Sequence, residues 1–441
     1  MRKWIAAALC LSMILSVCGC QQQEEGEPSV SSTAAPTTPT EGTEASVTQV
    51  PEKVTDPTQD PTEVAVPSEA PSEGETTPPV TGTQEIPLVA VSLIPVLEEE
   101  TDENGTTIFR YQHQTITAIL PDAPDASEKI TSTMEERGKE AAGSVEEILN
   151  WARQDYTGDS SWVPYSCQVA FVPARVDATT VSFSGAVWSF SGGVHPNCTR
   201  ISCSFDAASG DVLTLSDILS NTDVVEALYL KVMDGLDQRN RELDPNQSVW
   251  NDGYEEIVRE HFNLEHVSSA SWYFSDTGMH FYFSPYEIAP YVVGEVDIEI
   301  PYAELRGILK EEYFPEATTY EGAFSLNAAH QEQVDSAQFE ENILVDLKTD
   351  GTKVAVFSGS VIHRVQLEQG SWSAENQQTG SSQVVFAANR LTGQDLLLIT
   401  ADLTDAQAGL RLTLHCGENE TRSYFISQNQ EDGAIRLEAG A

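Results

Sequence analysis

The sequence predicts an α+β fold: a mainly antiparallel sheet covered by helices, followed by a small all-β C-terminal module, either a sandwich or a barrel. Between residues 85 and 315, segments follow in the order strands, helix, strands, helices, strands, helix, which is typical of this class. From residue 342 to 441, eight short strand-like runs follow one another without a helical period. Residues 316–341 show little patterning and are expected to form a connector.

The N-terminal residues have the pattern of a lipoprotein signal peptide. Arg2 and Lys3 precede an apolar run ending at Cys18, which is too short to stay in a membrane as a spanning helix. The following Gly19-Cys20 indicates cleavage after residue 19 and attachment of a lipid such as palmitate to Cys20. The sequence thus predicts a lipid-anchored protein on the extracytoplasmic face of the cell membrane. An ordinary secreted signal peptide is the alternative.

Residues 20–84 are predicted to be a disordered tether. They contain no aromatic residue and are rich in Pro, Thr and Glu, so they cannot bury enough apolar surface to offset the entropy of ordering. The tether would reach between roughly 45 Å as a flexible coil and about 200 Å when extended. It would therefore hold a folded region away from the membrane.

The chain is strongly acidic. Its formal net charge is −46, and the first 84 residues, with 12 acids and three bases, account for only −9 of it. The remaining −37 lies on residues 85–441, where it would repel nucleic acid and attract cationic partners. No nucleic-acid binding is expected. A surface whose acidity serves only solubility is the alternative interpretation.

The α+β region begins with a predicted hairpin, because Asn104-Gly105 separates the strand-like runs Leu88–Glu98 and Thr106–Ile119. A helix is predicted from Asp125 to about Tyr156, with Gly138 and Gly143 as points where it could bend. The other predicted elements are strands over 162–173, 180–190 and 296–300, helices over 223–240, 252–262 and 302–313, and a hairpin over 271–283. In the C-terminal module, strands are predicted over 342–347, 352–357, 360–368, 383–388, 395–401, 410–416, 421–427 and 433–437.

Residues 187–219 combine more signals than any other stretch. Gly192-Gly193 and Pro196-Asn197 predict a turn, and the alternation of Ile201, Cys203 and Phe205 predicts a strand after it. Ser216 is expected to be the N-cap of a short helical turn over 217–219.

Two sequence blocks resemble a known family. One comprises Gly192–Asn197, Phe205–Gly210 and Leu213–Leu219, and the other is Phe281–Tyr291. In these residues the chain resembles the extracellular domain of unknown function shared by RsiV-type lysozyme-sensing anti-sigma factors and by the non-catalytic part of PdaC-type peptidoglycan deacetylases. The resemblance covers roughly residues 86–309.

The resemblance implies a surface lipoprotein that binds or senses a cell-wall component such as peptidoglycan, or a cationic wall-active protein such as lysozyme. RsiV-type sensors also carry a cytoplasmic sigma-binding segment and a membrane-spanning helix, and we expect neither here. The alternative function is a cell-wall polymer hydrolase or deacetylase accessory enzyme.

Four cysteines remain after processing: Cys167, Cys198, Cys203 and Cys416. If Cys167 and Cys203 lie on neighbouring strands, they are the first disulfide pairing to test, and free buried thiols are equally compatible with the sequence. No cysteine or histidine has the spacing of a zinc site, so no metal and no cofactor is predicted.

His195 invites a catalytic interpretation, with Ser191 as nucleophile and Glu287 or Asp206 as the orienting acid. The neighbouring glycines and proline favour a structural turn instead. We therefore predict no catalytic residue and expect the protein not to be an enzyme.

The segment Pro285–Pro290 carries two prolines, and tyrosines lie within it and directly after it. It is either a rigid structural corner or an exposed recognition loop, and tyrosine with a carboxylate on a stiff loop suits contact with a sugar or a basic protein. The candidate binding residues are therefore Tyr286, Glu287 and Tyr291, together with His195 and Asn197 from the first block.

Overall fold

The structure is a computed structural model that describes residues 86–264, 271–315, 326–359, 361–372, 378–403, 408–415 and 421–440. The predicted signal peptide, the lipidation site Cys20, the tether and Cys416 lie outside these residues. Within the described ranges, no helix is both long and apolar enough to cross a membrane.

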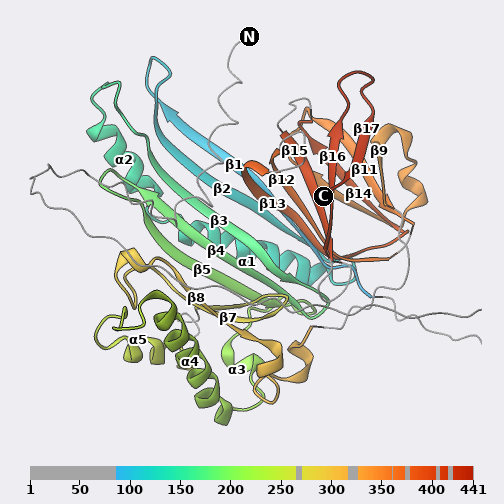
Figure 1. Ribbon diagram of the computed structural model, residues 1–441. Coiled ribbons are helices and arrows are strands. Elements are labelled where there is room, and N and C mark those ends of the chain that lie inside the picture. Colours follow the sequence, from blue (N-terminus) through green and yellow to red (C-terminus); the bar gives the residue numbers. More distant parts are fainter. Residues whose placement is uncertain are drawn as a thin grey trace, which may run out of the picture. The chain divides into compact units, whose positions relative to one another are not determined.

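A ten-stranded sheet runs through the described chain in the order β17-β16-β15-β12-β13-β1-β2-β3-β4-β5 (Figure 1). All neighbours are antiparallel except the parallel pair β2 and β3. The predicted hairpin is present, with Gly105 at a positive φ of 84° in its turn. The strands are β1 (Ala90–Thr101), β2 (Thr107–Ile119), β3 (Tyr165–Val176), β4 (Thr180–Phe190), β5 (Asn197–Asp206), β12 (Ile362–Trp372), β13 (Gln378–Leu391), β15 (Ala408–His415), β16 (Thr421–Gln428) and β17 (Ile435–Ala439).

Helices α1 (Pro124–Ala141) and α2 (Val145–Asp155) pack on one face of strands β1 to β5. Ile130 and Met134 of α1 are buried with Phe183 and Phe205 of the sheet. The sequence predicted one helix here, which was wrong. The Gly143 N–H turns back to the carbonyl of Glu140, and the chain starts a new helix two residues later.

The other face of β4 and β5 carries a second, three-stranded sheet of β6 (Trp272–Phe274), β7 (Gly278–Phe283) and β8 (Val296–Pro301). Hydrogen bonds attach it, among them that of the Phe274 N–H to Ser182 Oγ and that of Ser202 Oγ to the Trp272 carbonyl. Helices α3 (Leu215–Ile218), α4 (Val225–Leu243) and α5 (Tyr254–Glu260) pack with this sheet around one apolar core. The α+β class predicted from the sequence is thus confirmed.

Two details of this layer differ from the prediction. The N-cap of α3 is Thr214, which forms a capping box with Asp217, and not Ser216. The closing helix over 302–313 is absent, because Gly307 adopts a positive φ of 78° and the segment pairs with the end of α3 instead. Short 3-10 turns are η2 (Thr222–Val224), η4 (Tyr291–Val293), η5 (Tyr302–Glu304), η6 (Glu311–Tyr313), η7 (Gln331–Gln333) and η8 (Ser336–Gln338).

The C-terminal module is a sandwich. A four-stranded sheet packs against strands β12, β13, β15, β16 and β17 of the large sheet. Both sheets contribute to one core, with Val356 and Leu397 on one side and Leu367 and Leu412 on the other. All eight predicted strands are present. The smaller sheet consists of β10 (Glu341–Asp346), β14 (Asp395–Ala401), β11 (Thr352–Ser358) and β9 (Leu326–His330), of which β9 lies in the predicted connector.

The two parts share a sheet but have largely separate cores. Residues 90–92 of β1 pair with residues 386–388 of β13, and Leu88 and Ala90 are buried in the sandwich core. Apart from Ala387, however, the three cores of the α+β part are built from residues 89–314. The sequence does not indicate the continuous sheet, since at least 294 residues separate each residue of β1 from its partner in β13.

We therefore expect a fragment ending at Glu316 to fold without the sandwich. Its own cores remain nearly complete. It loses the pairing of residues 90–92 with β13, the hydrogen bonds of Asn389 and Arg390 to residues 86–89, and the ion pair of Arg364 with Asp276. Thermal unfolding followed by circular dichroism should give one cooperative transition, at a lower temperature than in the full chain. A broad, non-cooperative melt would show that the two parts fold as one.

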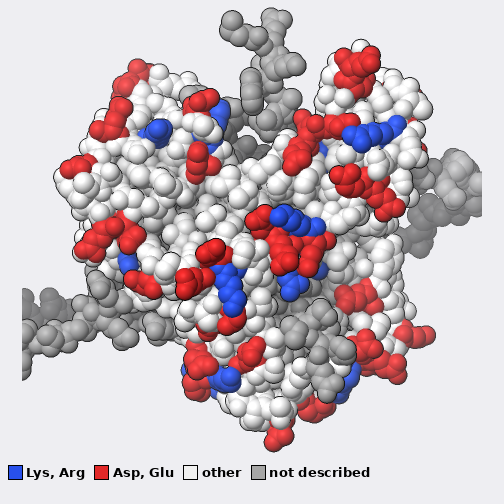
Figure 2. Space-filling model, turned by 180° about the vertical axis from the view of Figure 1, so that it is seen from behind, with Lys and Arg blue, Asp and Glu red and all other residues white. Residues whose placement is uncertain are grey.

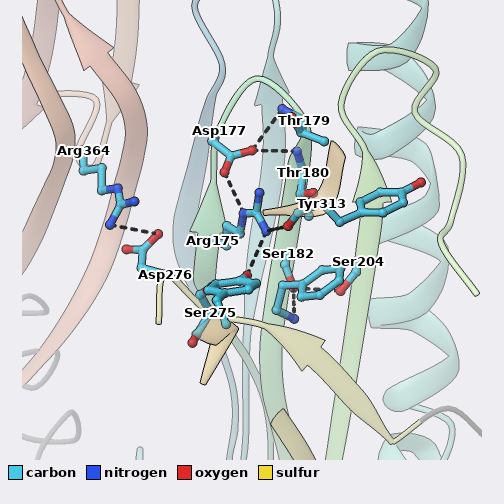
Figure 3. A network of polar contacts seen from close by, with 12 residues as sticks. Arg175, Asp177, Thr179, Thr180, Ser182, Ser204, Ser275, Asp276, Tyr313 and Arg364 are labelled. Carbon is cyan, nitrogen blue, oxygen red and sulfur yellow. Dashed lines mark hydrogen bonds and ion pairs between the residues drawn. The ribbon is translucent and has the colours of Figure 1, made fainter. Parts of the chain in front are cut away.

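Arg175, near the end of β3, ties the α+β part together. Its side chain is 0% exposed, and its Nε donates to Asp177 at 2.6 Å. Its Nη1 donates both to the Tyr302 hydroxyl at 2.8 Å and to the Tyr313 carbonyl at 2.6 Å (Figure 3). One side chain thus joins the large sheet to the two 3-10 turns that replace the predicted closing helix.

The predicted pairing of Cys167 with Cys203 does not form. Both thiols are free and buried, and the thiol of Cys198 donates to Glu295 at 3.0 Å. Cys167 lies on β3 opposite Ser189 of β4, whereas Cys203 lies on β5 opposite Phe183 of β4. The two cysteines are therefore two strand spacings apart, about 9–10 Å, and six residues apart along β4, about 20 Å, which is beyond the reach of a disulfide. Burial raises the pKa of Cys167 to about 11 and that of Cys203 to about 12, so both remain protonated thiols.

Candidate binding surface

Two loops from distant parts of the sequence meet at one end of β5. The first joins β4 to β5 and contains His195, and the second joins β7 to β8 and contains Tyr291. The two rings stack with centroids 3.8 Å apart and an interplanar angle of 18°, and the Tyr291 hydroxyl donates to the Pro196 carbonyl at 3.1 Å. The structure therefore brings together residues that the sequence proposed from separate blocks.

These loops expose an apolar and aromatic surface. The Tyr286 side chain is 59% exposed, and its ring centroid lies 5.3 Å from that of Tyr291. Val194 is fully exposed and Val292 is 82% exposed. We call the set Val194, His195, Tyr286, Tyr291 and Val292 the aromatic patch. Large apolar side chains left in solvent on neighbouring loops are a feature of interaction sites.

Tyr286 has a strained backbone, with a positive φ of 72° that residues other than glycine seldom adopt. Such a conformation costs on the order of 1 kcal/mol or more, and it persists only where the surrounding structure enforces it. Here Glu287 supplies the constraint, because its carboxylate accepts the Ser284 N–H at 2.7 Å and lies 2.8 Å from His261 Nε2. The loop is thus held with the Tyr286 ring outward.

The candidate residues therefore divide into two groups. His195, Tyr286 and Tyr291 form the patch itself, whereas Glu287 is half-buried and holds the loop from behind. Asn197 is exposed at the start of β5, opposite Ser189.

The catalytic arrangement considered from sequence is not assembled. His195 Nδ1 lies 3.0 Å from the Pro196 carbonyl, Glu287 is engaged by His261, and Asp206 accepts backbone N–H groups of its own turn. Neither acid is therefore positioned to orient His195.

A half-buried polar network that the sequence did not indicate fixes β8 against β5 beside the patch. Arg200 donates to Glu295 at 2.9 Å and to Ser184 at 2.7 Å, and it lies 3.4 Å from Asp297. The hydroxyl of Tyr273 donates to Asp297 at 2.8 Å, and burial together with this carboxylate raises the pKa of Tyr273. Only the long-range pairing of the two sheets brings these residues together, so no local pattern indicates them.

Carboxylates predominate on the molecular surface. Figure 2 shows Asp and Glu side chains on every described part of one face, and most of the Lys and Arg groups there touch them. Arg259 forms an ion pair with Glu226, and Lys231 forms one with Glu304. The few cations are thus largely neutralised, and the field beyond the surface is negative.

One protein-family model matches part of the chain. Residues 216–303 match the model described as "Protein of unknown function (DUF3298)". The chain contains a DUF3298 region. This region spans α3 to β8, including Tyr286, Glu287 and Tyr291, and it confirms the domain of unknown function predicted from the sequence.

Two solved structures of DUF3298 family members are similar to this chain. One is from Bacteroides fragilis, with 16% sequence identity and a TM-score of 0.35, and covers 51% of this chain and 94% of its own. The other is from Pseudomonas aeruginosa, with 17% identity and a TM-score of 0.32, and covers 53% of this chain and 98% of its own. No curated protein sequence matches the chain.

Proposed function

We propose that this protein is a surface-anchored lipoprotein whose α+β part, with its DUF3298 region, binds a cationic wall-active protein of the lysozyme type. The supporting observation is the aromatic patch, in which Tyr286, Tyr291 and His195 are presented by two loops that hydrogen bonds hold in place. Tyrosine is enriched among the residues that dominate protein interfaces, because it offers a large contact area at a low entropic cost.

Charge supports the same proposal. Residues 85–441 carry a formal charge of −37, which accelerates encounter with basic proteins and disfavours acidic ones. Long-range attraction alone does not select one basic protein over another. Selectivity has to come from a surface of defined shape, and the patch is such a surface.

Binding to two basic proteins at two salt concentrations tests the proposal. The mature protein is titrated by calorimetry with lysozyme and, as a control of similar charge, with cytochrome c, at 0.1 M and 1 M salt. The Debye length falls from ~10 Å to ~3 Å between these conditions, so attraction through charge alone fades. We expect lysozyme to keep measurable affinity at 1 M salt and cytochrome c to lose it. Equal affinities that vanish together would contradict the proposal.

A further inference from the structure

A pocket of about 260 Å³ lies at the open edge of the large sheet. Arg137 of α1 lines one side, residues 200–204 of β5 form the edge itself, and Trp272 of β6 and Tyr282 of β7 line the other side. The pocket shares no lining residue with the aromatic patch, so a ligand bound in it would be independent of the function proposed for the patch.

On the strand edge in this pocket, one residue has a backbone N–H and a backbone carbonyl that are not hydrogen-bonded within the described residues. β5 is the last strand of the sheet, and on the side away from β4 the Arg200 N–H donates to Ser284 Oγ while the Ser204 carbonyl accepts the Leu213 N–H. Backbone groups of alternate residues point the same way in an antiparallel strand, so the N–H and carbonyl of Ser202 also point away from β4. No group among the described residues forms a hydrogen bond with the Ser202 N–H or with the Ser202 carbonyl.

Two side-chain donors in the same lining also lack partners. Trp272 is 3% exposed, and its indole Nε1 has no hydrogen-bond partner among the described residues. Nε of Arg200 also has no hydrogen-bond partner among the described residues, whereas its two terminal nitrogens donate to Glu295 and Ser184. A buried N–H without a partner costs roughly 1–3 kcal/mol, so a ligand carrying an acceptor would gain by filling the pocket.

We infer that this pocket binds a single amino-acid residue that carries an amide on each side. The residue's carbonyl would accept from the Ser202 N–H and the Trp272 indole, and the same residue's N–H would donate to the Ser202 carbonyl. This is the pairing by which an added strand extends a sheet edge, reduced to one residue. A volume of about 260 Å³ lies below the range of drug-sized ligands, so the pocket has room for one such residue.

Indole resonances provide the test. The mature protein is labelled with ¹⁵N-tryptophan, and the Trp272 signal is assigned from its loss in Trp272→Phe. N-acetylalanine methylamide is added as the probe. The controls are N-acetylglucosamine, whose single trans amide cannot accept and donate on the same side, and alanine, which has no amide. We expect N-acetylalanine methylamide to move the Trp272 signal in a saturable manner and the two controls to leave it in place. An unmoved signal with N-acetylalanine methylamide, or equal shifts with either control, would overturn the inference.

A matched pair of variants locates the contact. Trp272→Phe should weaken binding of the probe about five- to tenfold, the effect of one lost hydrogen bond, measured by calorimetry. Trp250→Phe removes the other buried indole that lacks a partner among the described residues but does not line the pocket, and it should leave affinity unchanged. If the two tryptophan variants bind the probe with the same affinity, the pocket is not the site.

Discussion

Replacing Arg175 with methionine is expected to lower the free energy of unfolding by about 3 kcal/mol. The change removes three hydrogen bonds within the buried network of Figure 3 and leaves the Tyr313 carbonyl without its donor. It also removes the guanidinium lying 5.5 Å from the ring centroids of Phe274 and Tyr302. Methionine fills much of the space but cannot donate, so packing compensates only in part.

Urea unfolding of both proteins, followed by fluorescence, measures this loss. Arg239→Met is the matched control, because Arg239 is 44% exposed and lies 3.4 Å from Glu242 on the surface of α4. Such an exposed pair contributes at most about 0.5 kcal/mol. The role given to Arg175 would be wrong if the two variants unfolded at the same urea concentration.

Replacing Cys20 with alanine is expected to move the protein from the membrane fraction to the soluble fraction. The anchor inferred from the sequence is a lipid on this thiol, and alanine cannot accept one. Without the lipid, the acidic region has no attraction to an anionic membrane surface. Detergent phase partition of the two forms, detected by immunoblotting, distinguishes the outcomes. Equal retention of both in the detergent phase would contradict a lipid anchor at Cys20.

Local patterns predicted most of the elements. Asn104-Gly105 indicated the first hairpin correctly. Eight of the nine described strands of the sandwich followed from alternation bounded by turn residues, and β9, in the predicted connector, did not. Gly192, at a φ of 86°, formed the predicted turn, where a Cβ would come 2.8 Å from the Tyr165 hydroxyl. The prolines and tyrosines of the second block formed a stiff loop with an exposed ring, as one of the two interpretations required.

Features that depend on long-range pairing could not be predicted in this way. The cysteine pattern left a disulfide and free buried thiols equally open, and the thiols are free because β4 lies between the two strands. Sequence alone does not give strand order. The closing helix was wrong because apolar spacing over 302–313 suits a helix, while the left-handed Gly307 breaks it. The role of Glu287 as a support for its loop depends on His261, 26 residues away in the chain.

The most direct test of the proposed binding surface is the affinity of patch variants for lysozyme at 1 M salt. Tyr286→Ala and Tyr291→Ala should each weaken binding by about 1–3 kcal/mol, roughly 5- to 150-fold, and the loss should persist at high salt because it comes from contact area and not from charge. Leu344→Ala, which removes a 67% exposed apolar side chain from β10 of the sandwich, should have no effect. Unchanged affinity in both tyrosine variants would contradict the assignment of the aromatic patch as the binding surface.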